Sequence, residues 1–262
     1  MTCPALSITF LGTGTSSGIP MVGCDCEVCT SADPKDNRLR SSVLIGSSTT
    51  SIVVDSGPDF RFQMLRARVM QLDAILFTHP HKDHVAGLDD VRGYNFFSHK
   101  PMEVFANEMT QEVLIREFPY AFADTRYPGV PEINLNTIDL NPFYVGDIPV
   151  QPLQVWHMKM PVFGFRFGHF TYITDANRID ESEIQKANNS EVLVLNTLRK
   201  EKHISHFNLE EGIKMAKNLN AKQTYFTHLS HQMGRHEEIE RELPPGISLA
   251  HDQLIFTLPA IG

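Results

Sequence analysis

The segment from His79 to His84 places four side chains that can bind metal ions within six residues, namely His79, His81, Asp83 and His84. Imidazole and carboxylate groups suit zinc, manganese and iron, and the apolar run 74–77 before the segment is typical of a buried strand. The metal-binding side chains are therefore expected at a strand's end. Because alternate residues of an extended chain face the same way, His79 and His81 can share one ion. The adjacent Asp83 and His84 diverge and can reach a second ion, so the segment predicts two metals.

This spacing, His-x-His-x-Asp-His, resembles the signature of the metallo-β-lactamase superfamily of binuclear hydrolases. The resemblance implies an α/β fold, the four-layer αββα sandwich, whose remaining ligands follow at later strand ends in a fixed order. Alone, a histidine or aspartate at a strand end usually serves a turn. By resemblance, the ligands are His79, His81 and His157 for metal one, Asp83, His84 and His228 for metal two, and Asp175 as the bridge.

Two metal ions about 3.5–4 Å apart can clamp an in-line displacement and lower the pKa of a bridging water, which generates hydroxide. The resemblance thus implies a hydrolase with two divalent catalytic metals, zinc or manganese, and with Asp83 and Asp175 among its catalytic groups. Asp55 ends the strand expected over 51–55. In the superfamily this aspartate hydrogen-bonds the metal loop; an ordinary turn aspartate is the alternative.

Three of the four cysteines, Cys24, Cys26 and Cys29, crowd into a zinc-binding loop predicted at residues 23–30. Their spacing suits one metal ion better than disulfides in a reducing compartment. A closed structural zinc site needs a fourth nitrogen or sulfur ligand, and His231 can supply it. The phosphodiesterase of the carbon–phosphorus lyase pathway, a branch of the superfamily, carries a similar set that binds structural zinc. Reduced thiols in a loop are the alternative.

A departing alcohol needs a proton, and an imidazole near its ordinary pKa suits that task. His203 and His206 both precede the helix expected over 208–219. In the carbon–phosphorus lyase phosphodiesterase the general acid stands before a similar helix entry, so the resemblance implies that His206 is the acid. His203 stays open between a catalytic and a supporting role. Arg199 could contact phosphate, or could belong to a solvated loop.

The resemblance covers nearly the whole chain and implies a metal-dependent phosphodiesterase that acts on a small phosphodiester. A cyclic phosphodiester is the leading candidate. One alternative is an RNase Z-like endonuclease for transfer-RNA 3′ ends, which shares the opening loop 12–18. That branch has a long RNA-binding arm and lacks the three-cysteine cluster. Another is a non-enzymatic carrier like the pyrroloquinoline quinone biosynthesis B protein, in which gaps among the binuclear ligands are expected. The full ligand set here favours an enzyme.

The chain of 262 residues is 42% hydrophobic and shows no linker, so one domain over residues 1–262 is expected. A formal net charge of -8 argues against broad polyanion binding, and nucleic acid is therefore not an expected partner. Neither a signal peptide nor a membrane span is visible, which predicts a cytoplasmic protein. A homodimer stays open.

Periodicity also predicts how the later part of the chain is organised. A helix is expected over 85–97 and an irregular loop, which could overhang the site, over 121–130. The role of that loop cannot be read. Four strands are expected to form the second sheet: Ile133–Asp139, Val150–Trp156, Gly164–Phe167 and Phe170–Thr174.

Overall fold

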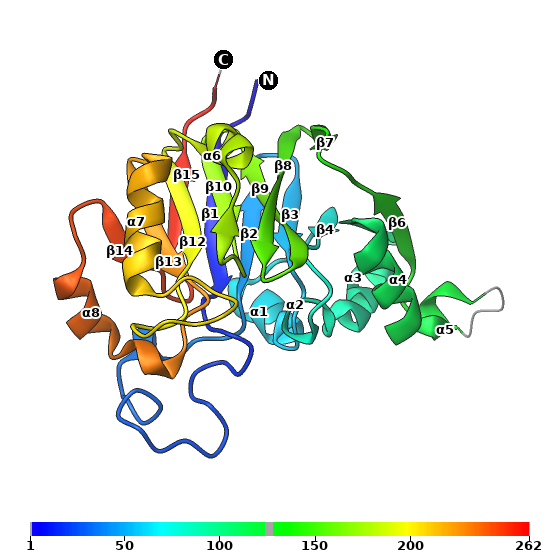
Figure 1. Cartoon of the computed structure of the whole chain (residues 1–262). Helices are drawn as coiled ribbons and strands as arrows, with labels where there is room; N and C mark the ends of the chain where they lie inside the picture. The colour runs from blue at the N-terminus through cyan, green and yellow to red at the C-terminus, as the bar shows by residue number, and fades with distance from the viewer. Residues whose placement is uncertain (1, 124–127, 262) are drawn as a thin grey trace.

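Two mixed β-sheets stack face to face in the computed structural model, which describes residues 2–123 and 128–261 (Figure 1). Across the first sheet the strands are β15 (Ile255–Leu258), β1 (Leu6–Gly12), β2 (Ser42–Gly46), β3 (Ser51–Val54), β4 (Ala74–Leu76), β5 (Met102–Ala106) and β6 (Ile133–Thr137). Across the second they are β11 (Arg178–Ile179), β8 (Ile148–His157), β9 (Met160–Phe167), β10 (Phe170–Ile173), β12 (Val192–Asn196), β13 (Gln223–Thr227) and β14 (Ile247–Leu249). β7 (Phe143–Val145) pairs with β8.

Helices cover the outer face of each sheet. On the first sheet lie α1 (Phe60–Ala67), α2 (Lys82–Val85), α3 (Arg92–Ser98), α4 (Glu108–Glu117) and α5 (Pro119–Phe122). On the second lie α6 (Glu181–Ala187), α7 (Leu209–Leu219) and α8 (His236–Glu242). Short 3-10 turns occur at η1 (Pro34–Asp36), η2 (Leu88–Val91) and η3 (His231–Met233). The layers are thus helix, sheet, sheet, helix, which confirms the predicted αββα sandwich.

Three apolar clusters hold the four layers together. In β3, Ile52 and Val54 belong to the cluster between the sheets, and Val53 belongs to the cluster under α1 and η2. All three side chains are fully buried. Because successive strand residues face opposite sides, a strand covered on both faces is apolar throughout, as this one is.

The sequence-based elements are largely confirmed, with two corrections. β6 pairs in parallel with β5 and so belongs to the first sheet, not the second. The helix expected over 85–97 is broken into α2, η2 and α3, and the break contains Gly87. A Cβ on Gly87 would lie 2.1 Å from the carbonyl oxygen of Gly57, so the chain bends where two backbones meet. Of the predicted irregular loop 121–130, residues 121 and 122 belong instead to α5, and residues 124–127 lie outside the described residues.

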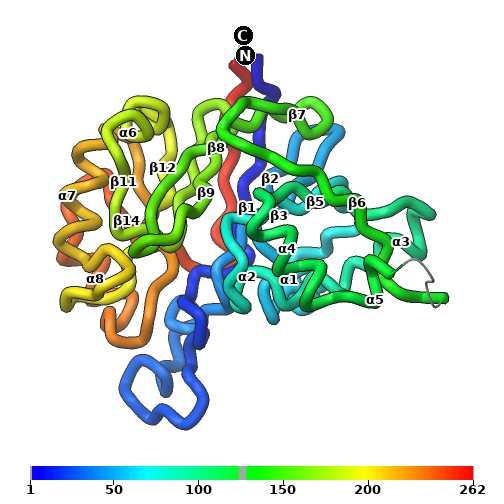
Figure 2. Tube along the Cα trace, turned by 45° about the vertical axis from the view of Figure 1, so that its right-hand side comes forward, coloured from blue at the N-terminus to red at the C-terminus, as the bar shows by residue number. Residues whose placement is uncertain are grey.

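The segments that leave β3, β4, β8, β10 and β13 meet at one edge of the sandwich. Figure 2 shows that this edge lies at the end of the molecule from which the long segment after β1 projects, opposite the two termini. Near the termini, Cys3 and Ile261 form an isolated antiparallel bridge. None of the helices described by the structure is both long and apolar enough to cross a membrane.

Gly57 provides a test of how tightly the loop after β4 is packed. A Cβ on Gly57 would lie 2.0 Å from the carbonyl oxygen of Asp83, whereas one on Gly93 in α3 would meet nothing within 4 Å. We expect Gly57→Ala to lower the free energy of unfolding by about 1–3 kcal/mol, because backbone must move. The control Gly93→Ala is expected to raise it by up to about 1 kcal/mol, since alanine favours helix. Urea denaturation measures both; equal stability of the two variants would contradict the close approach.

Candidate metal centre

Asp55, directly after β3, anchors the loop that follows β4. Its carboxylate is fully buried and accepts three hydrogen bonds. The Thr78 amide donates to Oδ1 at 2.9 Å, and the Thr78 hydroxyl donates to Oδ2 at 2.8 Å. His84 Nδ1 donates to Oδ2 at 2.7 Å. Asp55 therefore fixes both ends of the segment 78–84, which is the supporting role predicted for it.

The same hydrogen bonds determine which imidazole nitrogens are free. Because the Thr78 hydroxyl donates to Asp55, its oxygen accepts from His79 Nδ1 at 2.9 Å. His157 Nδ1 donates to the carbonyl oxygen of Ser205 at 2.9 Å. With Nδ1 protonated, the lone pair of each ring is at Nε2. The Nε2 atoms of His79 and His84 are buried and have no hydrogen-bond partner among the described residues, which is typical of metal ligands.

Asp175 lies at the centre of these rings. Its Oδ2 is 3.2 Å from His84 Nε2, and its Oδ1 is 3.3 Å from His228 Nε2. Asp83 Oδ2 is also 3.2 Å from His84 Nε2. Three sets have ligand atoms within 4.8 Å of one another: His79, His84 and Asp175; Asp83, His84 and His228; and His157, Asp175 and His206.

His81 belongs to none of these tight groups, and its side chain is exposed. Its ring centroid nevertheless lies 4.6 Å from that of His79 and 5.1 Å from that of His157. The structure thus brings all seven predicted binuclear ligands to one edge of the sandwich, with His81 on the solvent side.

Three of the residues at this edge have strained backbones. Asp55, Asp175 and His228 have φ angles of 64°, 53° and 58°, in the left-handed region that residues other than glycine rarely occupy. Each follows a strand closely, so the left-handed residue turns the chain sharply where its side chain is needed. Such strain concentrates at functional sites, and here it occurs three times in one cluster.

Burial and mutual attraction shift the pKa values strongly. Burial lowers the pKa of His79 well below its ordinary value. Burial alone would also lower the pKa of His84. The carboxylates of Asp83, Asp175 and Asp55 outweigh burial and hold the pKa of His84 well above its ordinary value. Burial raises the pKa of Asp175, yet His228 and His84 together bring it well below its ordinary range. The protein therefore holds carboxylates ionised around a position that favours positive charge, and the donor set fits divalent metal ions.

His206 lies inside this cluster rather than in solvent. It is buried, its ring centroid is 4.7 Å from that of His157 and 5.0 Å from that of His228, and its Nδ1 is 3.7 Å from Asp175 Oδ1. Burial lowers the pKa of His206 to about 3. This differs from the expectation of an ordinary imidazole pKa for His206.

His203 and Arg199, the other two candidates near the helix entry, lie in the loop beside His206. The His203 ring stacks on His206 at 5.3 Å, and its Nδ1 accepts from the Ser205 hydroxyl at 3.2 Å. Arg199 donates to Gln232 Oε1 at 2.7 Å and to the carbonyl oxygen of Lys202 at 3.1 Å. The guanidinium of Arg199 is thus held within the loop.

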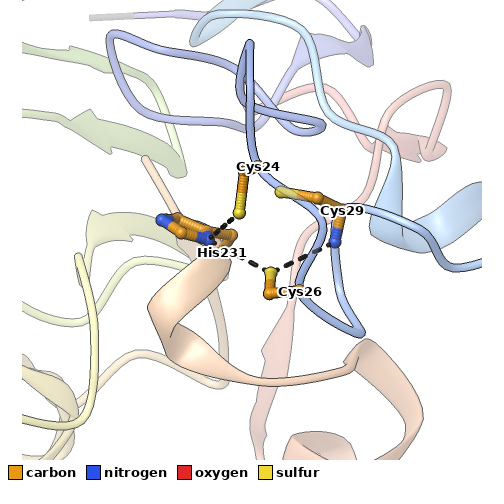
Figure 3. A group of neighbouring side chains, drawn as sticks. All are labelled: Cys24, Cys26, Cys29 and His231. Carbon is orange, nitrogen blue, oxygen red and sulfur yellow. Dashed lines mark hydrogen bonds between the residues drawn. The ribbon is translucent and has the colours of Figure 1, made fainter.

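The cysteine cluster forms a second, separate donor set. Cys24, Cys26, Cys29 and His231 have ligand atoms within 4.8 Å of one another, and Figure 3 shows their side chains gathered around one point. His231 Nδ1 lies 3.2 Å from Cys26 Sγ. That hydrogen bond lowers the pKa of Cys26 to about 6, whereas burial raises the pKa of Cys29 to about 11. Three cysteine sulfurs and one imidazole nitrogen within 4.8 Å of one another form a donor set that fits a tetrahedral zinc ion.

Two residues at the site were not among the sequence-based candidates. The Thr78 hydroxyl connects Asp55 to His79, because it is hydrogen-bonded to both side chains. Thr15 Oγ1 lies 3.2 Å from His228 Nε2. The repeated Phe-Thr-His in 77–79 and 226–228 is a signal that could have drawn attention to Thr78. Nothing in the local sequence connects Thr15 with a residue 213 positions away.

Comparisons with known proteins agree with this architecture. A family model described as "Beta-lactamase superfamily domain" matches residues 50–229, a range that contains every predicted binuclear ligand. The crystal structure of a new diphosphatase from the PhnP family superposes with a TM-score of 0.92 and 38% identity, covering 98% of each chain. Zn²⁺-bound PqqB from Methylobacterium extorquens has the same fold at 18% identity, with a TM-score of 0.75 over 95% of this chain and 99% of that one.

Among curated proteins, an octanoyltransferase of Porphyromonas gingivalis is 37% identical over 247 residues, which are 93% of this chain and 50% of that protein. The chain spans half or less of the curated relatives it matches. The family match, the diphosphatase superposition and the donor set together identify the group. The chain belongs to the β-lactamase superfamily, as a metallo-β-lactamase-fold hydrolase that resembles the PhnP family.

Proposed function

We propose that this protein is a phosphodiesterase that hydrolyses a small phosphodiester with the help of two divalent metal ions. A cyclic phosphodiester is the leading candidate substrate. The observation that carries the proposal is the convergence of five histidines and two aspartates at one edge. There, His79 Nε2 is buried without a hydrogen-bond partner among the described residues, and His84 Nε2 faces two carboxylates at 3.2 Å. A site of this kind favours cations and, with cations bound, favours a phosphate anion. The close superposition on a diphosphatase supports chemistry at phosphorus.

In the proposed arrangement His79, His81 and His157 hold one ion, Asp83, His84 and His228 hold the other, and Asp175 contacts both. Two divalent cations would supply hydroxide at neutral pH and neutralise charge on the phosphoryl group. The chain's own residues orient that chemistry. Asp55 and Ser205 fix the tautomers of His84 and His157 through hydrogen bonds of 2.7 and 2.9 Å.

His206 is proposed to protonate the departing oxygen. Its pKa is low because the ring is buried. A substrate phosphate beside the ring would favour the imidazolium form and raise that pKa toward the working range. His206 also lies in a tight group with His157 and Asp175, so a role as metal ligand is the competing assignment.

A second candidate substrate is a diphosphate, favoured by one observation: the structure that superposes at a TM-score of 0.92 is that of a diphosphatase. The same donor set could hydrolyse a phosphoanhydride or a phosphodiester, since both reactions displace an oxygen at phosphorus. They differ in the leaving group. A phosphate leaves readily, whereas an alkoxide needs a proton from an acid.

An RNase Z-like endonuclease and a non-enzymatic carrier both receive less support. In the segment 13–41, which projects from the site edge, Arg38 is buried and Arg40 is paired with Asp59 at 3.0 Å. This segment therefore offers little of the basic surface that RNA binding requires. A carrier like the pyrroloquinoline quinone biosynthesis B protein would not need the complete ligand set found here. The expectations about nucleic acid, membrane and homodimer contacts stay predictions, as do the single domain and the cytoplasmic location.

A substrate panel tests the proposal. Zinc- or manganese-loaded protein is assayed with a 2′,3′-cyclic nucleotide, bis-p-nitrophenyl phosphate, a dinucleoside diphosphate and a precursor transfer RNA. We expect turnover of the first two and none of the transfer RNA. Exclusive turnover of the diphosphate would transfer the proposal to the second candidate, and hydrolysis of none of the four would overturn it.

The role of His206 predicts a dependence on the leaving group. We expect His206→Ala to slow hydrolysis of a 2′,3′-cyclic nucleotide by roughly 10²–10⁴-fold, because its alkoxide needs a proton. Bis-p-nitrophenyl phosphate should be far less affected, since p-nitrophenolate leaves without one. Steady-state kinetics and metal analysis of the same variant provide the measurement. Equal losses on both esters together with a lost metal ion would make His206 a ligand instead of the acid.

The cysteine cluster is proposed to hold one structural zinc ion, so Cys26→Ser should lower the zinc content by one ion per chain and reduce the melting temperature. Cys3→Ser is the matched control, because Cys3 is a buried cysteine whose nearest described strand partner is Ile261. Elemental analysis after gel filtration gives the stoichiometry. If Cys26→Ser and the control retain the same amount of zinc, the structural site is wrong.

A further inference from the structure

Thr15 places a hydroxyl group against the proposed metal centre. Its Oγ1 lies 3.2 Å from His228 Nε2, and the side chain is only 7% exposed. Among the described residues this is the sole hydrogen-bond partner of that hydroxyl. Nε2 is the nitrogen of His228 that faces Asp175 Oδ1, at 3.3 Å. Thr15 therefore contacts the edge of the ring that faces the carboxylate at the centre of the site.

The position of Thr15 relative to His228 is fixed by backbone hydrogen bonds. The Thr15 amide donates to the carbonyl oxygen of Leu229 at 3.0 Å, and the Leu229 amide donates to that of Thr13 at 3.0 Å. Gly14 and Leu229 form a parallel bridge. The loop after β1 and the residue after His228 are thus joined on both sides of Gly14, and this pairing holds the Thr15 backbone beside His228.

The turn that begins at Thr15 is also braced from outside. The Gly18 amide donates to the carbonyl oxygen of Thr15 at 2.9 Å, and Gly18 has a φ of +64°, which glycine adopts without strain. Arg40 donates to the carbonyl oxygen of Ser16 at 3.1 Å while its guanidinium pairs with Asp59. A hydroxyl held this firmly costs little reorganisation when a ligand arrives.

Occupancy of His228 Nε2 by a cation would take away the hydrogen-bond partner that the Thr15 hydroxyl has among the described residues. That nitrogen has one lone pair, which cannot bind an ion and accept a hydrogen bond at the same time. The hydroxyl then becomes a free, buried donor beside a cationic centre. The group that arrives at such a centre is an anion, and an oxyanion accepts from a hydroxyl strongly.

We propose that Thr15 is a catalytic residue that donates a hydrogen bond to a non-bridging phosphoryl oxygen of the substrate, and likewise to inorganic phosphate. The inference rests on the proposed function for its reaction, but the chemistry it requires of a ligand is only a phosphoryl oxyanion. It assigns to the glycine-rich loop 12–18 a part in binding phosphate through one side chain. This differs from a nucleotide-binding loop, which works through the start of a helix.

The test compares Thr15→Val, which has nearly the same shape without the hydroxyl, with Thr15→Ser, which keeps the hydroxyl. In metal-loaded protein, Thr15→Val is expected to lower the affinity for inorganic phosphate roughly tenfold or more. Isothermal titration calorimetry measures this affinity. It should lower kcat/KM by a similar factor on the cyclic nucleotide and on bis-p-nitrophenyl phosphate, in contrast to His206→Ala. Thr15→Ser should restore most of both losses, and metal content should be unchanged.

Ser17→Ala is the matched control, because the Ser17 hydroxyl in the same turn already donates to the carbonyl oxygen of Gly18, at 3.3 Å. It should bind phosphate like the wild type. Unchanged phosphate affinity in Thr15→Val overturns the proposal, and so does a loss of metal ions, which would mean that Thr15 only orients His228. An equal loss in Thr15→Ser also overturns it, since a hydroxyl at position 15 would then not be sufficient to restore phosphate binding.

Failure of this inference can be told apart from failure of the proposed function. If the wild type binds inorganic phosphate and Thr15→Val does not, Thr15 keeps its assignment even when no phosphodiester in the panel is hydrolysed. If the wild type hydrolyses the phosphodiesters and Thr15→Val does so equally well, the function stands and the assignment of Thr15 is wrong.

Discussion

The buried carboxylate of Asp55 is the interaction on which the metal centre depends. It has no contact with solvent, and burial raises its pKa, so its ionised form relies on the hydrogen bonds from Thr78 and His84. Those bonds in turn set the free nitrogens of His79 and His84. Removal of this one carboxylate would leave a buried hydroxyl, an amide and an imidazole nitrogen without partners, and each such loss is costly.

The two sheets contribute to the centre in a similar way. Phe-Thr-His follows β4 directly, and β13 ends with Phe-Thr before His228, so each strand delivers a histidine to the shared edge from a different sheet. Left-handed residues turn the chain at Asp55, Asp175 and His228, where strand geometry would otherwise carry it past the site. Sandwich packing supports this strain, because β3, β10 and β13, the strands that precede these residues, are held within the two packed sheets. The edge between sheets is therefore where metal ligands from distant parts of the chain can meet.

The fold could be predicted because His-x-His-x-Asp-His after an apolar run resembles a known superfamily. That resemblance also singled out the later histidines and the aspartate that the structure brings to the same edge. The features that the sequence analysis missed or misassigned depend on contacts between residues that are distant in the sequence. The pattern of β6 fits either sheet, and only its pairing with β5 decides. The break near Gly87 depends on Gly57 lying against it. The low pKa of His206 and the contact of Thr15 with His228 arise from burial and from chain segments that no periodicity relates.

The central claim is that one edge of this sandwich holds two divalent ions bridged by Asp175, apart from a third ion at the cysteines. Anomalous diffraction from crystals of zinc-loaded protein, recorded on both sides of the zinc absorption edge, tests it most directly. The account predicts two peaks about 3.5–4 Å apart, on either side of the Asp175 carboxylate, and a separate peak among Cys24, Cys26, Cys29 and His231. A single peak at the histidine edge, or two peaks without Asp175 between them, would contradict it.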